Sequence, residues 1–231
     1  MTPEEQCDIK AILDMFHLEL TLACQSFFAW KTIHNLASAD KKIFNSINRN
    51  ALSWNLILHS LQATFFITIG RIFDTNPSSF SVHKVFRCCK KEILEFNKDN
   101  LRTRRLGDSK EIPDWLDGFI EEAYEAQPAD FNKLKKEVNK VQKVYEEIYR
   151  PIRHKIFAHK DSEHLSNSSG LFQETSIGEA EKILTILYQA KMSIQHLYDN
   201  GKLSAIDYWK LNEEEHVHKD IESLLNKITK I

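Results

Sequence analysis

Apolar residues recur at three- and four-residue steps along most of the chain, which is the spacing typical of amphipathic α-helices. Residues 3–37 show this pattern and predict one long helix, with Pro3 in its first turn. A second long helix is predicted over residues 39–73, ending at the turn Asp74-Thr75-Asn76-Pro77. The apolar run 52–72 within it favours a buried central helix.

The middle of the chain predicts shorter elements. Ser79 or Ser81 can cap a third helix, which carries apolar residues as far as Phe96. A polar loop is expected over residues 98–111, followed by a short helix that begins at Pro113.

The last third of the chain predicts two long helices and a helical tail. One helix begins near Pro128, and Pro151 should kink or restart it just before Arg153, because proline lacks the backbone donor. A surface loop is expected over residues 160–173, then a helix over 176–198 closed by Asn200-Gly201. The charge-rich tail is expected to be helical from Asn212.

Composition supports an all-α fold. Only six glycines and five prolines occur in 231 residues, so the chain has few turn-forming residues for a many-stranded sheet. We expect an antiparallel helical bundle over residues 1–200 and a C-terminal helical tail, 201–231, that packs on the same domain.

Charge and cysteine usage restrict the function. A net charge of −2 excludes a nucleic-acid binder that uses its whole surface, so any RNA contact must be local. The four cysteines lack metal-type spacing and are expected to be reduced core thiols.

The acidic N-terminus predicts a cytoplasmic protein, and the polar residues within 52–72 argue against a membrane span. No cofactor motif is present, so we expect neither a cofactor nor a metal.

One segment carries candidate chemistry. Residues 149–161, YRPIRHKIFAHKD, place Arg153 and His154 shortly before His159. A fixed cation can bind a phosphate, and an imidazole can move protons near neutral pH. These residue types are what metal-independent cleavage of RNA requires. The simpler alternative is that they are ordinary polar residues near a helix end, where cations meet the helix dipole favourably.

Helix geometry argues against a site built from a single copy. Along a straight helix the six residues from Arg153 to His159 span about 9 Å and turn by roughly 120°. Two copies facing each other across a two-fold axis could bring both arginines and both histidines around one phosphate. The sequence therefore predicts a homodimer with a composite site.

The segment from Arg153 to His159 resembles the signature of the HEPN superfamily, an arginine followed four to six residues later by a histidine, with a polar residue commonly after the arginine. His154 occupies the polar position. Gly70-Arg71-Ile72-Phe73-Asp74 and the following serines are similar to the preceding segment of the abortive-infection (AbiU-like) branch. The resemblance covers roughly residues 10–200.

This resemblance implies a dimeric all-α bundle whose active members are metal-independent endoribonucleases of phage defence or toxin–antitoxin systems. It implies that Arg153 holds the scissile phosphate, that His159 is the general acid or base, and that His154 orients the phosphate. An antitoxin or another regulatory partner would then restrain the activity. Some members only bind RNA, nucleotides or a protein partner without cleavage, and this is the alternative function.

Other charged residues have weaker functional interpretations. Asp74 could pair with Arg153 while Arg71 extends the positive field, or Asp74 and Arg71 could form a helix-end ion pair. Lys155 and Lys160 could contact the RNA backbone or remain solvated charges.

Two further charged segments have competing interpretations. The arginines within 98–111 could form an RNA-facing patch or lie in a solvated connection. Residues 213–218, EEEHVH, contain metal-ligand types, but their two histidines point roughly 200° apart on a helix.

Overall fold

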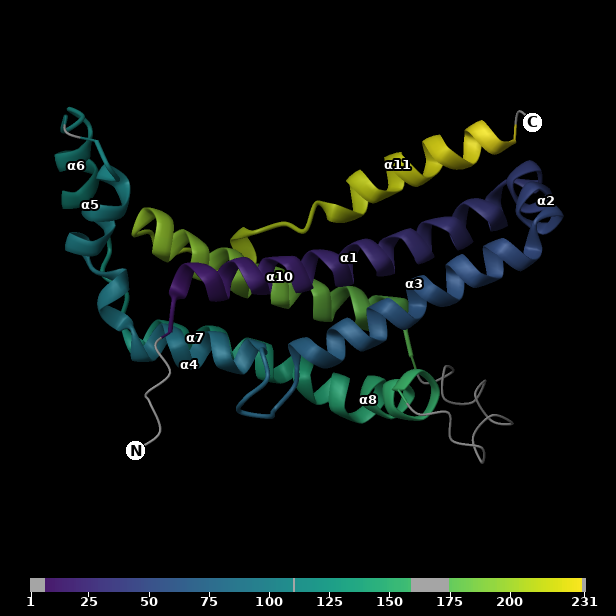
Figure 1. The fold of residues 1–231 in the computed structure, drawn as a ribbon, viewed down its shortest axis with the longest axis horizontal. Helices are drawn as coiled ribbons and strands as arrows, with labels where there is room; N and C mark the ends of the chain where they lie inside the picture. Colours follow the sequence, from purple (N-terminus) through teal and green to yellow (C-terminus); the bar gives the residue numbers. More distant parts are fainter. Residues whose placement is uncertain (1–6, 110, 159–174, 230–231) are drawn as a thin grey trace. The chain divides into compact units, whose positions relative to one another are not determined.

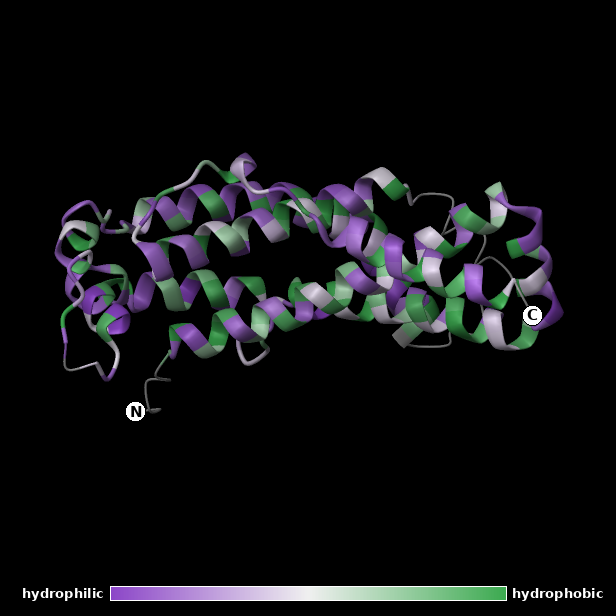
Figure 2. Ribbon diagram, turned by 90° about the horizontal axis from the view of Figure 1, so that it is seen from above, coloured by the Kyte–Doolittle hydropathy of each residue, from purple (hydrophilic) through white to green (hydrophobic). Residues whose placement is uncertain are grey.

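The computed structural model describes residues 7–109, 111–158 and 175–229, and these ranges contain helices and turns without a strand. The all-α prediction is therefore confirmed (Figure 1). Figure 2 shows hydrophobic and hydrophilic residues alternating within single turns of the long helices. This is the pattern expected when one stripe of each helix packs into a core.

The chain forms two compact units, and each takes three segments from distant parts of the sequence. Unit 1 consists of Met1–His17, Phe73–Lys143 and Thr185–Lys210. Unit 2 consists of Leu18–Ile72, Val144–Leu184 and Leu211–Ile231. The predicted division into a domain over 1–200 and a tail over 201–231 stays a prediction.

Unit 1 packs around an aromatic cluster. The Phe96 ring lies 5.0 Å from Phe131 and 5.6 Å from Tyr198, measured between ring centroids. Its elements are the start of α1 (Ile9–Ala39), α4 (Val82–Lys91), η1 (Ile93–Phe96), α5 (Lys98–Leu106), α6 (Leu116–Glu121), nearly all of α7 (Pro128–Val144), the later part of α10 (Ile177–Asn200) and η4 (Ile206–Tyr208).

Unit 2 contains the motif segment. Its elements are most of α1 (Ile9–Ala39), α2 (Lys41–Arg49), α3 (Ala51–Ile72), η2 (Tyr145–Tyr149), α8 (Arg150–Ile152), η3 (Arg153–Ala158), the start of α10 and α11 (Glu213–Ile228). In this unit α1 and α3 pack as an antiparallel pair, with Phe27 and Phe65 ring centroids 5.1 Å apart.

The predicted start of the first helix near Pro3 is wrong. Cys7 and Asp8 are not helical, and α1 begins at Ile9. The Asp8 carboxylate accepts a hydrogen bond from the Ala11 N–H at 2.9 Å, which satisfies one of the free donors at the helix start. Pro3 lies outside the described residues.

The single helix predicted over 39–73 is two helices. Asp40 caps α2 by accepting from the Lys42 N–H at 2.7 Å. Helix α2 ends at Arg49, and the backbone of the next residue, Asn50, leaves the helical region. Helix α3 then runs to Ile72 and stops at the predicted turn, where the Asp74 carboxylate accepts from the Asn76 N–H. A short polar side chain that bonds the local backbone explains the stop at Asp74, whereas at Asn50 the backbone N–H itself bonds to the Ile47 carbonyl.

The expectation that residues 52–72 form a buried central helix is correct only for the second half of α3. Phe65, Phe66 and Ile69 are buried, whereas Leu52 is 89% exposed and Leu56 66% exposed. Within the described ranges, α3 is the one helix whose length and composition would allow a membrane crossing. A single such helix is weak evidence for a span.

The expectation of four reduced cysteines is also wrong. Cys7 and Cys88 form a disulfide, which neither the adjacent Cys88-Cys89 pair nor the spacing along the chain indicated. Cys24 and Cys89 are free and buried. Burial raises the pKa of the Cys89 thiol to about 12, so this thiol stays protonated at neutral pH and chemically inert.

The helix predicted over 176–198 is confirmed as α10. The Ser176 hydroxyl oxygen accepts from the Glu179 N–H at 3.0 Å at its start. Gly201 follows its end with a φ of 56°, a conformation that disfavours side chains. Helix α11 begins at Glu213, one residue after the predicted Asn212.

Candidate functional site

The motif lies at the end of a continuous helical stretch. Helix α7 passes into a π-helical turn, η2, then into the short α8, and again into π-helical geometry in η3. The Arg150 N–H bonds to the Tyr145 carbonyl five residues earlier. This wider turn leaves room for the Pro151 ring, which would clash with the carbonyl four residues before it. The predicted interruption is therefore a change of helix type rather than a break.

Arg153 lies directly against the backbone of α3. A methyl group added at Gly70 would overlap Cδ and Nε of Arg153 and would lie 2.8 Å from its Cζ. The arginine can therefore occupy this place because residue 70 has no side chain. Glycine inside a helix costs up to about 1 kcal/mol relative to alanine, and this close approach is the structural reason for that cost.

Within the described residues of unit 2, the Arg153 guanidinium forms no ion pair. The side chain is half-buried, and its Nε is shielded from solvent without a hydrogen-bond partner. Shielding a charged donor without a partner is unfavourable, and such a group in a folded protein calls for an explanation. A bound anion would supply the missing partner.

The rest of the motif segment is fixed by aromatic packing. Phe157, four residues after Arg153, stacks on Phe66 with ring centroids 5.1 Å apart, and it lies 5.8 Å from the His59 ring. Because Arg153 contacts Gly70 and Phe157 contacts Phe66, η3 runs antiparallel to α3. The stretch from Arg153 to Phe157 is thereby held along one face of α3.

The other predicted residues of the segment are placed differently. His154 is exposed, and Lys155 is half-buried. His159 and Lys160 lie outside the described residues, so the proposed catalytic histidine and the second lysine stay predictions. The structure brings Arg153 together with Gly70.

Arg71 is already paired. Its Nη2 lies 2.8 Å and its Nε 3.0 Å from the same Glu19 carboxylate oxygen on α1, so this arginine adds little net positive field. Asp74 belongs to unit 1, whereas Arg153 belongs to unit 2. The predicted pairing of Asp74 with Arg153 stays a prediction.

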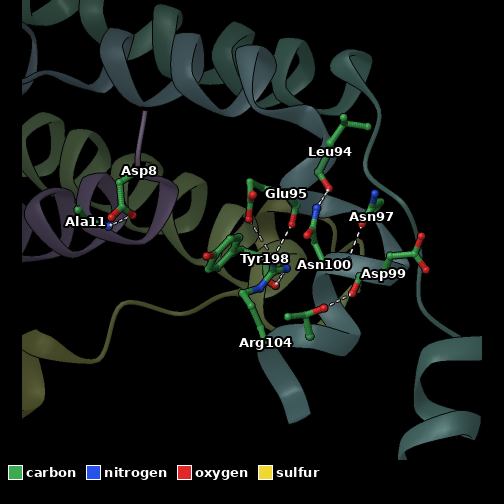
Figure 3. Close-up of polar contacts among 10 residues, drawn as sticks. Asp8, Ala11, Leu94, Glu95, Asn97, Asp99, Asn100, Arg104 and Tyr198 are labelled. Atoms are coloured by element: carbon green, nitrogen blue, oxygen red, sulfur yellow. Dashed lines mark hydrogen bonds and ion pairs between the residues drawn. The ribbon is translucent and has the colours of Figure 1, made fainter. Parts of the chain in front are cut away.

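The loop predicted over 98–111 is largely helix α5, capped by the Asn97 side chain, which accepts from the Asn100 N–H at 2.8 Å. Its arginines are all engaged. Arg104 donates to the carbonyls of Glu95 at 2.7 Å and Tyr198 at 2.8 Å, as Figure 3 shows. Arg102 pairs with Asp117, and Arg105 donates to Asn200. These side chains hold neighbouring elements of unit 1 together, so both sequence interpretations of the segment were incomplete.

The acidic segment at the start of α11 is structural as well. Glu214 pairs with Lys31 of α1 at 2.6 Å, and Lys31 also contacts Glu181 at the start of α10. Across the described ranges no group of three or more His, Cys, Asp or Glu side chains could hold a metal ion.

Sequence reasoning missed three features beside Arg153. Gly70 gives the arginine its place, and Phe66 and His59 hold the aromatic end of the motif. A glycine inside a strongly apolar helix was the available signal, because glycine there usually marks a close backbone approach.

Tyr149 is buried and donates to the Ser176 carbonyl at 3.1 Å. Burial raises the pKa of the Tyr149 phenol, which therefore stays neutral near neutral pH.

This geometry can bind an anion. A planar guanidinium presents several donors and suits phosphate recognition, and its charge is little screened in a half-buried position. Among the described residues of the motif segment, Arg153 is the half-buried guanidinium that could bind a phosphate in this way.

Comparison with known proteins gives one family. The family model for AbiU2, a HEPN family, matches residues 6–231, including the C-terminal residues that the sequence resemblance left out. No curated protein and no solved structure matches the chain. The helical architecture and the match over nearly the full length agree, and the chain belongs to the AbiU2 family of HEPN proteins.

Proposed function

We propose that this protein is a metal-independent endoribonuclease of the HEPN type that acts in phage defence by abortive infection or in a toxin–antitoxin system. Membership of the AbiU2 family supports this class of function. The observation that carries the proposal is the half-buried Arg153 guanidinium, which lacks an ionic partner among the described residues of unit 2. An antitoxin or another regulatory protein would hold the activity in check, and the enzyme would work in the cytoplasm.

The proposed reaction is attack of the RNA 2′-hydroxyl on the adjacent phosphorus. Arg153 binds the scissile phosphate and stabilises the charge that develops in the transition state. His159 removes the 2′-proton or protonates the leaving 5′-oxygen, and His154 orients the phosphate. The products are a cyclic phosphate and a free 5′-hydroxyl. DNA lacks the attacking group and would not be cleaved.

We propose that the enzyme is a homodimer, because Arg153 and His159, six residues apart along a straight helix, would not share one face within a single copy. The exposed first half of α3 supports this assembly. Leu52, Leu56 and Ile57 are exposed there, one to two turns from His59, which contacts the motif residue Phe157. A second copy that covers this apolar surface would bring a second motif close to the first.

Purified protein incubated with single-stranded RNA in the presence of a chelator tests the proposal. The wild type should release fragments that end in a cyclic phosphate, whereas His159→Ala and Arg153→Ala should not. Arg150→Ala is the matched control, because Arg150 is an exposed arginine on the same helical stretch. RNA binding that depends on Arg153, without a cleaved product, would instead select the non-catalytic HEPN binding module.

A further inference from the structure

A cavity of about 270 Å³ lies in unit 2, between α1, α3 and the start of α10. Its volume is just below the range of about 300–1,000 Å³ typical of small-molecule sites, which suits one ring system rather than a large ligand. Aromatic side chains form much of its wall: Phe27, Trp30, Phe65, Phe66 and Tyr149. Stacking on aromatic rings is how proteins commonly hold unstacked nucleobases.

Two polar side chains face this cavity without partners in the described chain. Gln62 and Ser26 both line it, and neither side chain forms a hydrogen bond with another described residue. Ser26 is 4% exposed and adds a hydroxyl to the wall of the cavity. A glutamine amide offers a donor and an acceptor side by side, which matches the edge of a nucleobase.

Two rings that line the cavity, those of Tyr149 and Phe66, lie 5.8 Å apart and come from the segments that meet at Arg153. Tyr149 precedes Arg153 by four residues, and Phe66 precedes Gly70 by four residues. Four residues correspond to about 6 Å of helix rise, which is comparable to the span between a phosphate and a neighbouring base. A strand with its phosphate on Arg153 could therefore place an adjacent base in the cavity.

We propose that the cavity receives one unstacked nucleobase of the RNA strand, next to the phosphate held by Arg153, and that Gln62 reads the edge of this base. The inference rests on the proposed function, because it assigns the cavity to the same RNA substrate. It makes the cavity a determinant of which nucleotide adjoins the cleaved bond.

Binding measured by tryptophan fluorescence tests the inference independently of cleavage. The probes are 2′-O-methyl tetranucleotides of A, C, G and U, which cannot be cleaved, and the four nucleoside 5′-monophosphates. A base stacked beside Trp30 should quench fluorescence. Trp30→Phe should abolish this quenching, since it retains an aromatic wall and leaves Trp54, Trp115 and Trp209 in place.

Gln62→Leu should weaken binding of the preferred tetranucleotide about tenfold and reduce the difference between bases, because an unpaired base edge would remain. Gln25→Leu is the matched control, an exposed glutamine on α1 outside the cavity. Equal binding by both variants, or quenching that persists in Trp30→Phe, would overturn the inference.

The remaining outcomes separate this inference from the nuclease proposal. RNA cleavage without Trp30 quenching would remove the cavity from the mechanism and leave the nuclease intact. Quenching without cleavage by any form of the protein would keep the base site and reject the nuclease. Monophosphates that bind as tightly as tetranucleotides would show that the base comes from a free nucleotide, which would overturn the assignment to an RNA strand.

Discussion

Two arginines, Arg104 in unit 1 and Arg153 in unit 2, are both partly buried on helices, yet their surroundings differ. Arg104 donates to two backbone carbonyls and lies 3.9 Å above the centre of the Tyr198 ring. Arg153 lies against Gly70 without a described ionic partner. The Nε of each arginine is shielded without a hydrogen-bond partner, so the contrast lies in the terminal nitrogens. Those of Arg104 donate to the protein, whereas those of Arg153 form no bond to a described residue of unit 2 and are available to an external anion. The difference separates a structural arginine from a candidate functional one.

Removing Arg153 should reduce RNA cleavage more than any other substitution considered below. Arg153→Ala should lower RNA cleavage by about 100- to 1000-fold, the typical cost of losing a transition-state donor. The melting temperature should change little, because no described ion pair is lost. Initial rates and thermal melts measured on the same samples check both expectations. Arg153→Lys should recover little activity, because a lysine lacks the planar fork of donors.

Removing Arg104 should lower the stability of the protein and leave its cleavage activity unchanged. Arg104→Ala leaves the carbonyls of Glu95 and Tyr198 without their donor, which should lower the free energy of unfolding by about 2 kcal/mol. Cleavage per folded molecule should be unchanged. Denaturant titration and activity at a temperature where both proteins are folded provide the test. A loss of activity without a loss of stability would contradict the contrast between the two arginines.

Gly70→Ala should displace the Arg153 side chain without removing it, which tests whether the position of this arginine matters for cleavage. The added methyl group would overlap the arginine side chain, so cleavage should fall by roughly tenfold through misplacement of the phosphate-binding group. Gly118→Ala is the matched control, because a methyl group there meets no atom within 4 Å. That control should stabilise the protein by roughly 0.5 kcal/mol and leave cleavage unchanged. Equal activity of the two variants would mean that Gly70 does not position the site.

The smallest expected effect is stabilisation by a simple anion. Sulfate that binds Arg153 should raise the free energy of unfolding by roughly 0.4 kcal/mol when its concentration equals its Kd. Thermal melts at constant ionic strength, with chloride as the reference salt, measure this effect. Arg153→Ala should remove the sulfate-specific part and Arg104→Ala should retain it. The same sulfate response in both variants would place the anion elsewhere.

Local patterns in the sequence predicted that a segment is helical better than they predicted where the helix begins or ends, or which of its side chains are buried. The spacing of apolar residues indicated α3, and the polar turn after Phe73 gave its end. The spacing did not indicate that Leu52 and Leu56 are exposed, because an apolar stripe can face a core or an open surface. The pairing of Cys7 with Cys88, 81 residues apart, depends on the path of the whole chain and had no local signal.

The amino-acid sequence was enough to indicate the helical class, the family resemblance and Arg153 as the candidate phosphate-binding residue. Periodicity and short motifs are properties of neighbouring residues, so they can be read without the fold. Which arginines donate to the protein through their terminal nitrogens became clear only from the tertiary structure. Arg104 and Arg153 have the same side chain, and only contacts with segments distant in sequence distinguish them: Tyr198 for the first and Gly70 for the second. The energetic state of a charged group depends on the partners that folding brings to it, and residue type alone does not specify those partners.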